Sequence, residues 1–467
     1  MSLVLAIDVG TSSVKLLLTD EKNFEKLHAF HTPFPSGDDS GGIIDSRDYL
    51  DSIWKGIREW LIEALPNRKK IAKVGITSHI QSALLITKTG QHFAHMHRWD
   101  HPIDSAVSDD FISQFSGEWP GLVMNSVLNP LGSWMPMRLR NWALTYPEAG
   151  KIIYENGGYA LQVKDALNYD LCGVIASDAR SMRGWLNFEN EVDAQLSSWV
   201  GLGDICPSIL EPQETLGEVN DFGSEISGID EGVEVIVGCD DFSAGIHGFA
   251  SRTRTLLNMA NTTEHLAVTL LDKKSLIAQQ HATETGLSFL PKCGDLEAVL
   301  YCSTASGGVT LKMCLPRIKG FPLEEVGWDE EGYIAALNWL IDIMGARPEN
   351  GVDAEISFDA EIFTKRGLKP SAKHIGGWDG DPSRLSPRVH AWMIFEGLID
   401  TLHPIRVALL PFTNEGRPVK IGGGLSMIGP VLESRAARWP QGIEVVATRE
   451  ISARGICRLL GIEVEVD

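Results

Sequence analysis

Short apolar runs alternate with amphipathic segments along the whole chain, and their spacing separates strands from helices. Residues 3–9 are almost wholly apolar and predict a buried strand, and residues 15–19 predict a second strand after a short polar turn. Residues 46–65 repeat apolar positions at helical spacing, which predicts an amphipathic helix. Residues 73–77 and 83–87 predict two further strands. This alternation of strands and helices is typical of an α/β fold.

A similar cycle begins near the middle of the chain. Strands are predicted over residues 233–237, 255–259 and 266–270, and residues 419–421 predict a strand that runs into three glycines. A helix is predicted over residues 328–344. In both halves, a small polar turn separates two strands.

The length of the chain indicates more than one domain. A chain of 467 residues exceeds the size at which one hydrophobic core usually divides. Because the strand-turn-strand pattern occurs in both halves, we expect two related lobes. The N-terminal lobe is predicted over residues 1–246 and the C-terminal lobe over residues 247–467.

Composition and charge narrow the class of protein. A hydrophobic content of 43% and a charged content of 22% are ordinary for a soluble globular protein, and no apolar run approaches the ~18 residues of a membrane span. The seven cysteines form no Cys-x-x-Cys pair, which predicts reduced thiols in a cytoplasmic protein. A net charge of −21 disfavours nucleic acid and anionic lipid as partners. An anionic ligand would therefore need a site made locally.

The first candidate motif is Asp8-Val9-Gly10-Thr11-Ser12-Ser13-Val14-Lys15, directly after the first predicted strand. A turn of small residues lets backbone N–H groups approach a polyphosphate, and an acid at the end of a strand can hold Mg²⁺. It is no Walker A loop, because it has no Gly-Lys-[Ser/Thr]. On these residues alone, an ordinary polar hairpin is an equal alternative.

The second and third motifs follow strands of the second cycle. Asp240 and Asp241 end an apolar strand, and one carboxylate there could accept a proton from an attacking hydroxyl. The alternative is that these acids cap a helix, which fits at least one of the two. Gly422-Gly423-Gly424 could let the backbone lie against a ribose, although a tight turn explains three glycines as well.

Taken in order, these motifs resemble the FGGY family of carbohydrate kinases. The resemblance extends from Asp8 to Gly455 and is closest to the sedoheptulokinase and xylulokinase branch. Further segments that resemble the family's landmarks are Trp142 with Pro147-Glu148, Val163-Lys164-Asp165-Ala166-Leu167, Ser177-Asp178-Ala179 and Ser306-Gly307-Gly308. The family implies an α/β fold of two actin-like ATPase lobes, which are ribonuclease H-like, with an interlobe cleft.

The resemblance also implies roles for residues at matching positions. Asp241 is the expected general base and sugar ligand, and Asp8 is the expected Mg²⁺ ligand. The residues implied for the nucleotide are Thr11, Ser12, Ser13, Lys15, Thr263, Gly308, Gly423 and Gly424. Those implied for the sugar are His79, Gln81, Trp99 and Asp100, although Trp99 could also be a packed core aromatic.

The chain also departs from the family's pattern. The branch's usual Ser-Gly-Gln-Met-His-Gly is Thr77-Ser78-His79-Ile80-Gln81-Ser82 here, and glycerol kinases carry Arg-Glu where Ile80-Gln81 stands. The second phosphate loop lacks its usual glycine and reads Ala260-Asn261-Thr262-Thr263. These departures weaken the assignment of the sugar and leave the fold untouched.

The function predicted from this resemblance is transfer of the γ-phosphoryl group of MgATP to a hydroxyl of a sugar, namely a ketose like sedoheptulose or xylulose. ATP and Mg²⁺ are the expected cofactors, and a homodimer is expected. Two alternatives stay open: a catalytically silent sensor that binds sugar and nucleotide, and an actin-like ATPase that uses no sugar. Intact Asp8 and Asp241 argue against the first, and the Trp99-Asp100 segment argues against the second.

Overall fold

A computed structural model gives the fold and side chains of most of the chain. It describes residues 2–11, 13–20, 25–31, 43–65, 70–93, 95–99, 103–115, 134–186, 190–251, 254–261, 263–270, 276–285, 287–304, 307–321, 330–345, 356–358, 378–379, 381–446 and 450–463. The chain divides into two compact units. The first consists of 1–250, 272–298 and 450–465, and the second of 251–271, 299–449 and 466–467.

The first unit is built on a seven-stranded mixed sheet. Its order is β11-β12-β5-β1-β2-β3, and the short β13 also pairs with β5. The strands of this sheet are β1 (Leu3–Val9), β2 (Ser13–Thr19), β3 (Glu25–His31), β5 (Ile71–Ser78), β11 (Thr215–Glu218), β12 (Glu234–Ile236) and β13 (Cys239–Asp240). Strand β1 is antiparallel to β2, whereas it is parallel to β5.

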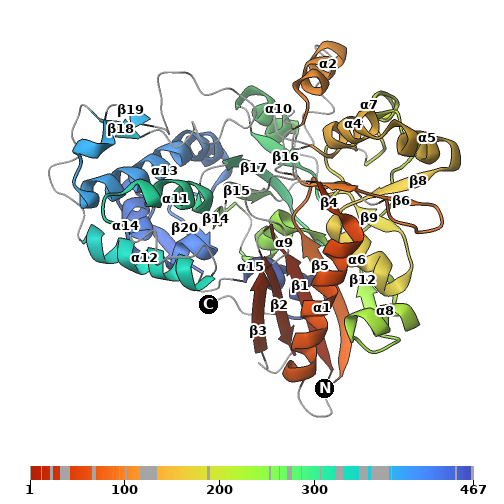
Figure 1. The fold of residues 1–467 in the computed structure, drawn as a ribbon. Helices are drawn as coiled ribbons and strands as arrows, with labels where there is room; N and C mark the ends of the chain where they lie inside the picture. The colour runs from red at the N-terminus through yellow and green to blue at the C-terminus, as the bar shows by residue number, and fades with distance from the viewer. Residues whose placement is uncertain are drawn as a thin grey trace. The chain divides into compact units, whose positions relative to one another are not determined.

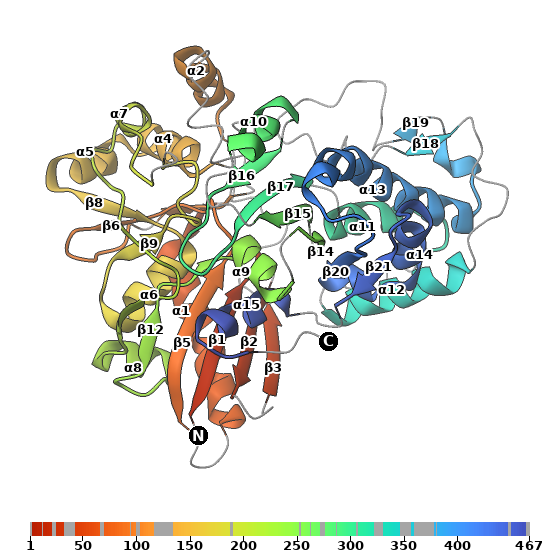
Figure 2. The ribbon, with the colours of Figure 1, turned by 180° about the vertical axis from the view of Figure 1, so that it is seen from behind.

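Strand β1 is buried along its whole length because both faces of the sheet are covered. On one face, Leu3, Leu5 and Ile7 share a core with α1 (Ser46–Ala64). On the other, Val4 and Ala6 pack with α15 (Ile451–Leu459), which lies beside α9 (Asp241–Gly248) (Figures 1 and 2). Burial on two faces explains why β1 reads as a continuous apolar run.

The remaining described elements of the first unit include three two-stranded sheets and a second hydrophobic core. The helices are α2 (Ser105–Phe115), α4 (Met135–Thr145), α5 (Pro147–Asn156), α6 (Val163–Cys172), α7 (Ala194–Val200), α8 (Asp221–Ser227) and α10 (Leu276–Thr285). The strands are β4 (Ile43–Asp45), β6 (Leu84–Thr87), β7 (His95–His97), β8 (Gly158–Leu161), β9 (Ala176–Asp178), β10 (Ser208–Leu210) and β16 (Ser288–Leu290).

The second unit has a sheet of its own, in which five strands run in the order β17-β15-β14-β20-β21. They are β14 (Leu256–Ala260), β15 (Glu264–Leu270), β17 (Ala298–Thr304), β20 (Val419–Gly422) and β21 (Ile443–Val445). The helices are α11 (Gly308–Cys314), α12 (Glu330–Met344), α13 (Pro387–Leu409) and α14 (Gly429–Arg438), and β18 (Ser357–Phe358) pairs with β19 (Trp378–Asp379). The long α13 packs against β15, α12 and α14.

The secondary structure predicted from the sequence is confirmed, with shifts of one or two residues at the ends of elements. The strand predicted at 15–19 begins at Ser13, and the helix predicted at 46–65 ends at Ala64. The predicted boundary at residue 246 lies near Ala250, where the first segment of unit 1 ends, but two later segments return to that unit. None of the described helices is both long and apolar enough to cross a membrane.

Two glycines let α9 and α15 approach closely. A Cβ at Gly455 would overlap the carbonyl oxygen of Ala244, and a Cβ at Gly248 would overlap that of Ile451. Because these obstacles are backbone atoms, they cannot move aside as a flexible side chain could.

We expect Gly455→Ala to destabilise the protein by about 1–3 kcal/mol or more through this overlap. Gly429→Ala is the matched control, since a Cβ there meets nothing within 4 Å. Thermal unfolding measures both. Equal unfolding temperatures for the two variants would contradict the close helix packing.

Candidate active site

Three neighbouring strands of the first unit deliver polar residues to one edge of the sheet. Strands β1 and β13 both lie parallel to β5, with Asp8 opposite Thr77 and Asp240 opposite Ser78. Parallel strands end at the same edge, so Asp8, Asp240 and the segment after Ser78 come together although they are up to 232 positions apart in sequence. The sequence predicted functional residues in all three segments.

Asp8 is 3% exposed and forms an ion pair with Lys15 on the antiparallel strand β2. The Nζ of Lys15 lies 3.4 Å from Oδ2 of Asp8 and 3.9 Å from Oε2 of Glu450, which precedes α15. The charge of Asp8 raises the pKa of Lys15, burial opposes this shift, and Glu450 adds to it. The structure therefore places a fixed ammonium group beside the predicted metal ligand. Glu450 was not predicted from the sequence.

The two consecutive acids have different surroundings. Asp240 is fully buried, accepts from the N–H of Ser243 at 3.1 Å, and lies 2.9 Å from the guanidinium of Arg183. Burial would raise the pKa of Asp240, but Arg183 and the hydrogen bond from Ser243 outweigh burial and lower it. Asp240 therefore caps α9 as an ionised group, as one of the two acids was expected to do.

Asp241 is the first residue of α9 and is partly exposed. Its Oδ1 accepts from the N–H of Phe242 at 2.8 Å, and its other carboxylate oxygen bonds to no residue that the structure describes. Burial, followed by the negative charges of Asp240 and Asp8, raises its pKa from 3.8 to about 7. A carboxylate with this pKa and an uncommitted oxygen is suited to accept a proton near neutral pH.

The turn between β1 and β2 is connected to the predicted sugar segment. The turn closes through a hydrogen bond from Gly10 N–H to the carbonyl of Ser13 at 2.9 Å. The indole N–H of Trp99 donates to Oγ1 of Thr11 at 3.0 Å, and the backbone N–H of Trp99 donates to Oγ of Ser82 at 3.2 Å. Trp99 is only half-buried, so it is not an enclosed core aromatic. The expected residues Ser12 and Asp100 lie outside the described residues.

His79 is buried and uses both ring nitrogens within the protein. Nδ1 lies 3.1 Å from the carbonyl oxygen of Val9 and must donate to it, which leaves Nε2 to accept from the hydroxyl of Ser82 at 3.1 Å. These bonds join the end of β1 to the segment that holds Trp99. The geometry therefore favours a positioning role for His79 over direct contact with a sugar.

Gln81 adopts an unusual backbone conformation, with φ of 72°. Its backbone N–H donates to Oε1 of Gln162 at 2.9 Å, and its own Oε1 accepts from the N–H of Met135 at 2.6 Å. Side-chain Nε2 has no partner among the described residues. Non-glycine residues at positive φ are strained and often functional. Gln81 thus offers a hydrogen-bond donor in Nε2, whereas Oε1 already accepts one bond.

A group of buried ion pairs stabilises this edge of the sheet. Lys164 on α6 lies 2.6 Å from Asp165 and 3.0 Å from Asp178, and all three side chains are fully buried. The backbone N–H of Lys164 donates to Oγ of Ser78 at 3.1 Å, and its Nζ donates to the carbonyl of Val237 at 3.3 Å. These bonds connect α6 to the end of β5 and to the residue that follows β12, which is a structural role for the Lys-Asp motif found in the sequence.

The chemistry of the described side chains fits Mg²⁺ at Asp8. Within the described part of the chain, no three His, Cys, Asp or Glu side chains form a metal-binding group. Mg²⁺ at kinase sites is usually held by one or two carboxylates together with phosphate oxygens and water. A single buried carboxylate at the end of a strand matches that requirement.

The second unit gathers the other predicted nucleotide residues. Gly308 N–H donates to the carbonyl of Asn261 at 3.0 Å, and Gly424 N–H donates to Oδ1 of Asn261 at 3.2 Å. Thr263 belongs to the same turn as Asn261, because the carbonyl of Thr263 accepts from the N–H of Asn261 at 3.2 Å. Gly308, Gly424 and Thr263 are therefore neighbours, and Asn261 connects them.

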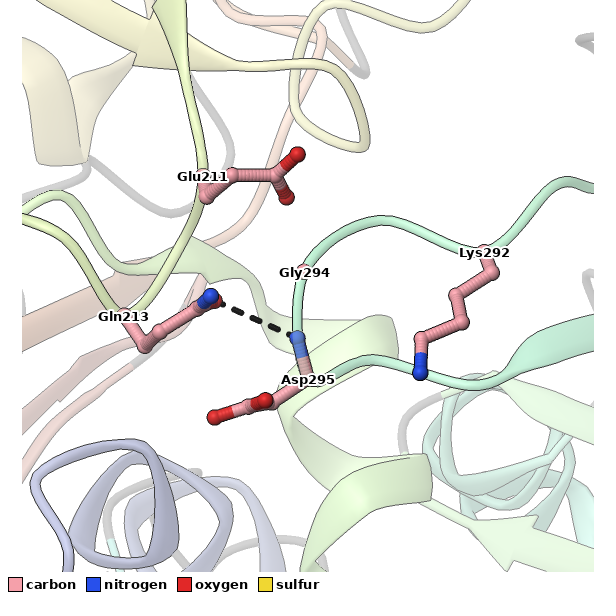
Figure 3. Close-up of a pocket in the computed structure, with 5 residues that line it drawn as sticks. All are labelled: Glu211, Gln213, Lys292, Gly294 and Asp295. Carbon is pink, nitrogen blue, oxygen red and sulfur yellow. Dashed lines mark hydrogen bonds between the residues drawn. The ribbon is translucent and has the colours of Figure 1, made fainter.

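The first unit also contains a cavity of about 410 Å³. It is lined by Glu211, Gln213, Lys292, Gly294 and Asp295, as Figure 3 shows. Oε1 of Gln213 accepts from the N–H of Asp295 at 3.2 Å across this cavity. No residue predicted for the site lines it.

Comparison with protein families identifies the class of protein. The N-terminal domain model of the FGGY family of carbohydrate kinases matches residues 3–248. This match covers more than half of the chain, so the chain belongs to the FGGY family of carbohydrate kinases, and it is an enzyme of the phosphotransferase class. Comparison with curated protein sequences gives no match.

Solved structures confirm the fold. Over its whole length the chain is similar to xylulose kinase and to gluconate kinase from Lactobacillus acidophilus, at 15% and 16% identity, with TM-scores of 0.75 and coverage of 91% of each. It is also similar to Plasmodium falciparum glycerol kinase with ADP, at 14% identity and a TM-score of 0.77, covering 98% of this chain and 89% of that one. The predicted actin-like ATPase fold is thus confirmed.

The raised pKa of Asp241 has a consequence for stability. The folded protein keeps this proton up to about pH 7, whereas the unfolded chain releases it near the ordinary pKa of 3.8. The folded state therefore binds more protons, and the stability that Asp241 contributes at low pH is lost as the pH rises through about 7.

We expect Asp241→Asn to stabilise the ligand-free protein at pH 8.5, by up to roughly 4 kcal/mol, and by less at pH 5.5. Thermal unfolding at the two pH values measures the difference. Asp240→Asn is the matched control and should destabilise at both, because it removes the charge of the buried carboxylate that pairs with Arg183. A destabilised Asp241→Asn at pH 8.5 would refute the raised pKa.

Proposed function

We propose that the protein transfers the γ-phosphoryl group of MgATP to a hydroxyl of a ketose with five to seven carbons. The observation that carries this proposal is Asp241, a partly exposed carboxylate with a pKa of about 7 and one uncommitted oxygen. It shares the edge of one sheet with Asp8 and Lys15. Family membership supplies the reaction class.

In this mechanism, Asp241 accepts the proton of the attacking hydroxyl. A base with a pKa near the working pH combines a useful ionised fraction with a useful proton affinity. Asp240 cannot take this role well, because its lowered pKa and its bonds to Arg183 and Ser243 keep it ionised and engaged. The structure thus supports the division of roles expected from the sequence.

Lys15, Asp8 and Thr11 act on the phosphate side. The ammonium of Lys15 is held between two carboxylates and provides positive charge where the chain otherwise carries a net charge of −21. The indole of Trp99 orients the hydroxyl of Thr11. Asp8 would hold Mg²⁺, which when bound neutralises charge on the nucleotide phosphates. Positioning and charge neutralisation supply most of the catalysis in phosphoryl transfer.

Trp99 and Gln81 are the proposed sugar-facing groups. The half-buried indole offers a flat surface for a C–H face of the sugar, and Nε2 of Gln81 offers a donor to a carbonyl or hydroxyl oxygen. A ketose supplies both kinds of oxygen. Xylulose kinases among the similar structures support this choice of sugar class. The cytoplasmic location and the homodimer stay predictions from the sequence.

Wild-type protein with MgATP should form ADP only when a suitable ketose is present. Asp241→Asn should lower kcat by about 10²–10⁴-fold while nucleotide binding is kept, because it removes the base and not the fold. A coupled assay of ADP release with and without sugars measures this. ADP formation that needs no sugar would indicate an actin-like ATPase, and binding without turnover would indicate a silent sensor.

Gln81→Glu is an isosteric test of the sugar class. The carboxylate still accepts from Met135 N–H but no longer donates, so we expect kcat/KM for ketoses to fall by about 10²-fold or more. Xylulose, ribulose, sedoheptulose, erythritol and glycerol should be compared, with ATP affinity as the control. Polyols should lose less than ketoses, because a ketose carbonyl can only accept a hydrogen bond and the substituted carboxylate offers it no donor. An unchanged preference would show that Gln81 does not face the sugar.

A further inference from the structure

The second unit repeats the strand-end arrangement of the first with different groups. Strand β14 lies parallel to β20, with Met259 opposite Gly422. The turn after β14 and the glycine segment after β20 therefore begin at the same edge of the sheet. Asn261 occupies the first position of that turn, directly after Ala260. It is also a residue of the loop that departs from the family's usual glycine-containing pattern.

Asn261 makes hydrogen bonds to three separate segments. Its backbone N–H donates to the carbonyl of Thr263 at 3.2 Å within the turn. Its backbone carbonyl accepts from the N–H of Gly308, the first residue of α11, at 3.0 Å. Its side-chain Oδ1 accepts from the N–H of Gly424 at 3.2 Å. One residue thus joins all the segments that hold the nucleotide residues predicted in the second unit.

The backbone conformation at Gly423 leaves room for the contact between the Asn261 side chain and Gly424. Gly423 has φ of 104°, a conformation that residues with a Cβ rarely adopt. A Cβ at this position would overlap Oδ1 of Asn261 and would lie 2.8 Å from the carbonyl oxygen of Ala260. The glycine therefore permits the close approach that the Asn261 side chain requires.

A buried ion pair fixes the same two segments from the side of the core. Glu264, the first residue of β15, pairs with Arg435 on α14, and both side chains are nearly inaccessible to solvent. Nδ2 of Asn258 donates to Oε2 of Glu264 at 3.2 Å. Burial raises the pKa of Glu264, and the charge of Arg435 opposes that shift. Helix α14 follows the glycine segment, so the turn and this segment are tied at two points.

The hydroxyl of Thr263 is oriented by a short hydrogen-bonded chain. Oγ1 of Thr263 lies 3.1 Å from Nε2 of His265, and Nδ1 of His265 lies 2.6 Å from Oγ of Ser303 on β17. These contacts fix the side chain of Thr263 while Asn261 fixes its backbone. The turn is therefore organised before any ligand binds, which reduces the entropy lost on binding.

We propose that Asn261 is the positioning residue that assembles the nucleotide-binding surface of the second unit, by holding the Thr263 turn, the start of α11 and the glycine segment together. This inference rests on the proposed function, since it requires that these segments bind the nucleotide. It assigns a use to the residue that the sequence showed only as a departure from the family's pattern. Asn261 acts through Gly424 and Gly308, and no contact of its own with a nucleotide is needed.

Asn261→Ala tests this role by removing the bond to Gly424 while keeping the backbone bonds. The dissociation constant of a non-hydrolysable ATP analogue with Mg²⁺, measured by calorimetry on the full chain without sugar, should rise roughly tenfold, as expected for one lost hydrogen bond in a preorganised site. KM for ATP should rise with it, whereas KM for the sugar should stay within about twofold. If Asn261 had a purely structural role, the substitution would lower the unfolding temperature and weaken the binding of ATP and of the sugar alike.

A double-mutant cycle with Gly423→Ala makes the test specific. In the wild-type background, Gly423→Ala should strongly weaken binding of the ATP analogue, because the added Cβ displaces the side chain of Asn261. In the Asn261→Ala background the overlap with Oδ1 is gone, so the same substitution should have a smaller effect, and the two changes should not be additive. Additive effects, or unchanged analogue binding by Asn261→Ala, would overturn the inference. Failure of the wild-type protein to bind the analogue would instead overturn the proposed function.

Discussion

The parallel pairing of β1 and β13 with β5 is the constraint on which the candidate active site depends. Its register sets Asp8 opposite Thr77 and Asp240 opposite Ser78, so three segments distant in sequence end at one edge. The edge is held by core on both faces of β1 and by the buried Lys164 group beneath it. A shift of one residue in this register would turn these acids to the opposite face of the sheet. The same backbone pairing thus determines which residues of these strands are buried and where the candidate functional residues lie.

Local patterns in the sequence predicted most of the secondary structure and several residues of the candidate site. Apolar runs and helical spacing located the strands and helices, because burial on one or two faces leaves a direct trace in the sequence. Asp8 and Lys15 were both predicted as site residues, and the ion pair between them appears only in the structure, where β1 and β2 bring them opposite each other. The contributions of Glu450 and Arg183 could not be predicted, because their contacts join residues that only the tertiary fold brings together. The same holds for the return of residues 272–298 to the first unit.

Hydrogen-bond partners explain why residues that contact a sugar are hard to assign from sequence. A histidine in a motif reads as a ligand-binding group, but Val9 and Ser82 take both nitrogens of His79. Gln81 reads as both donor and acceptor, yet Met135 N–H takes its acceptor and leaves the donor. Residue type indicates what a side chain can do, whereas the partners already present determine what remains for a substrate. Specificity therefore depends on contacts that a motif does not contain.

The proposed function requires each unit to attract an anionic nucleotide, and the two units differ in the groups that would do so. With a net charge of −21, the chain can attract a polyphosphate only through local groups. Under the proposed function, the first unit would use a formal charge, the ammonium of Lys15, which Asp8 and Glu450 keep protonated and fixed in place. The second unit would instead use neutral groups of the segments that Asn261 holds together, since the N–H groups of Gly308 and Gly424 are themselves engaged by Asn261. A fixed neutral donor needs no countercharge, so it would add affinity for an anion without adding a second cation that would have to be paired.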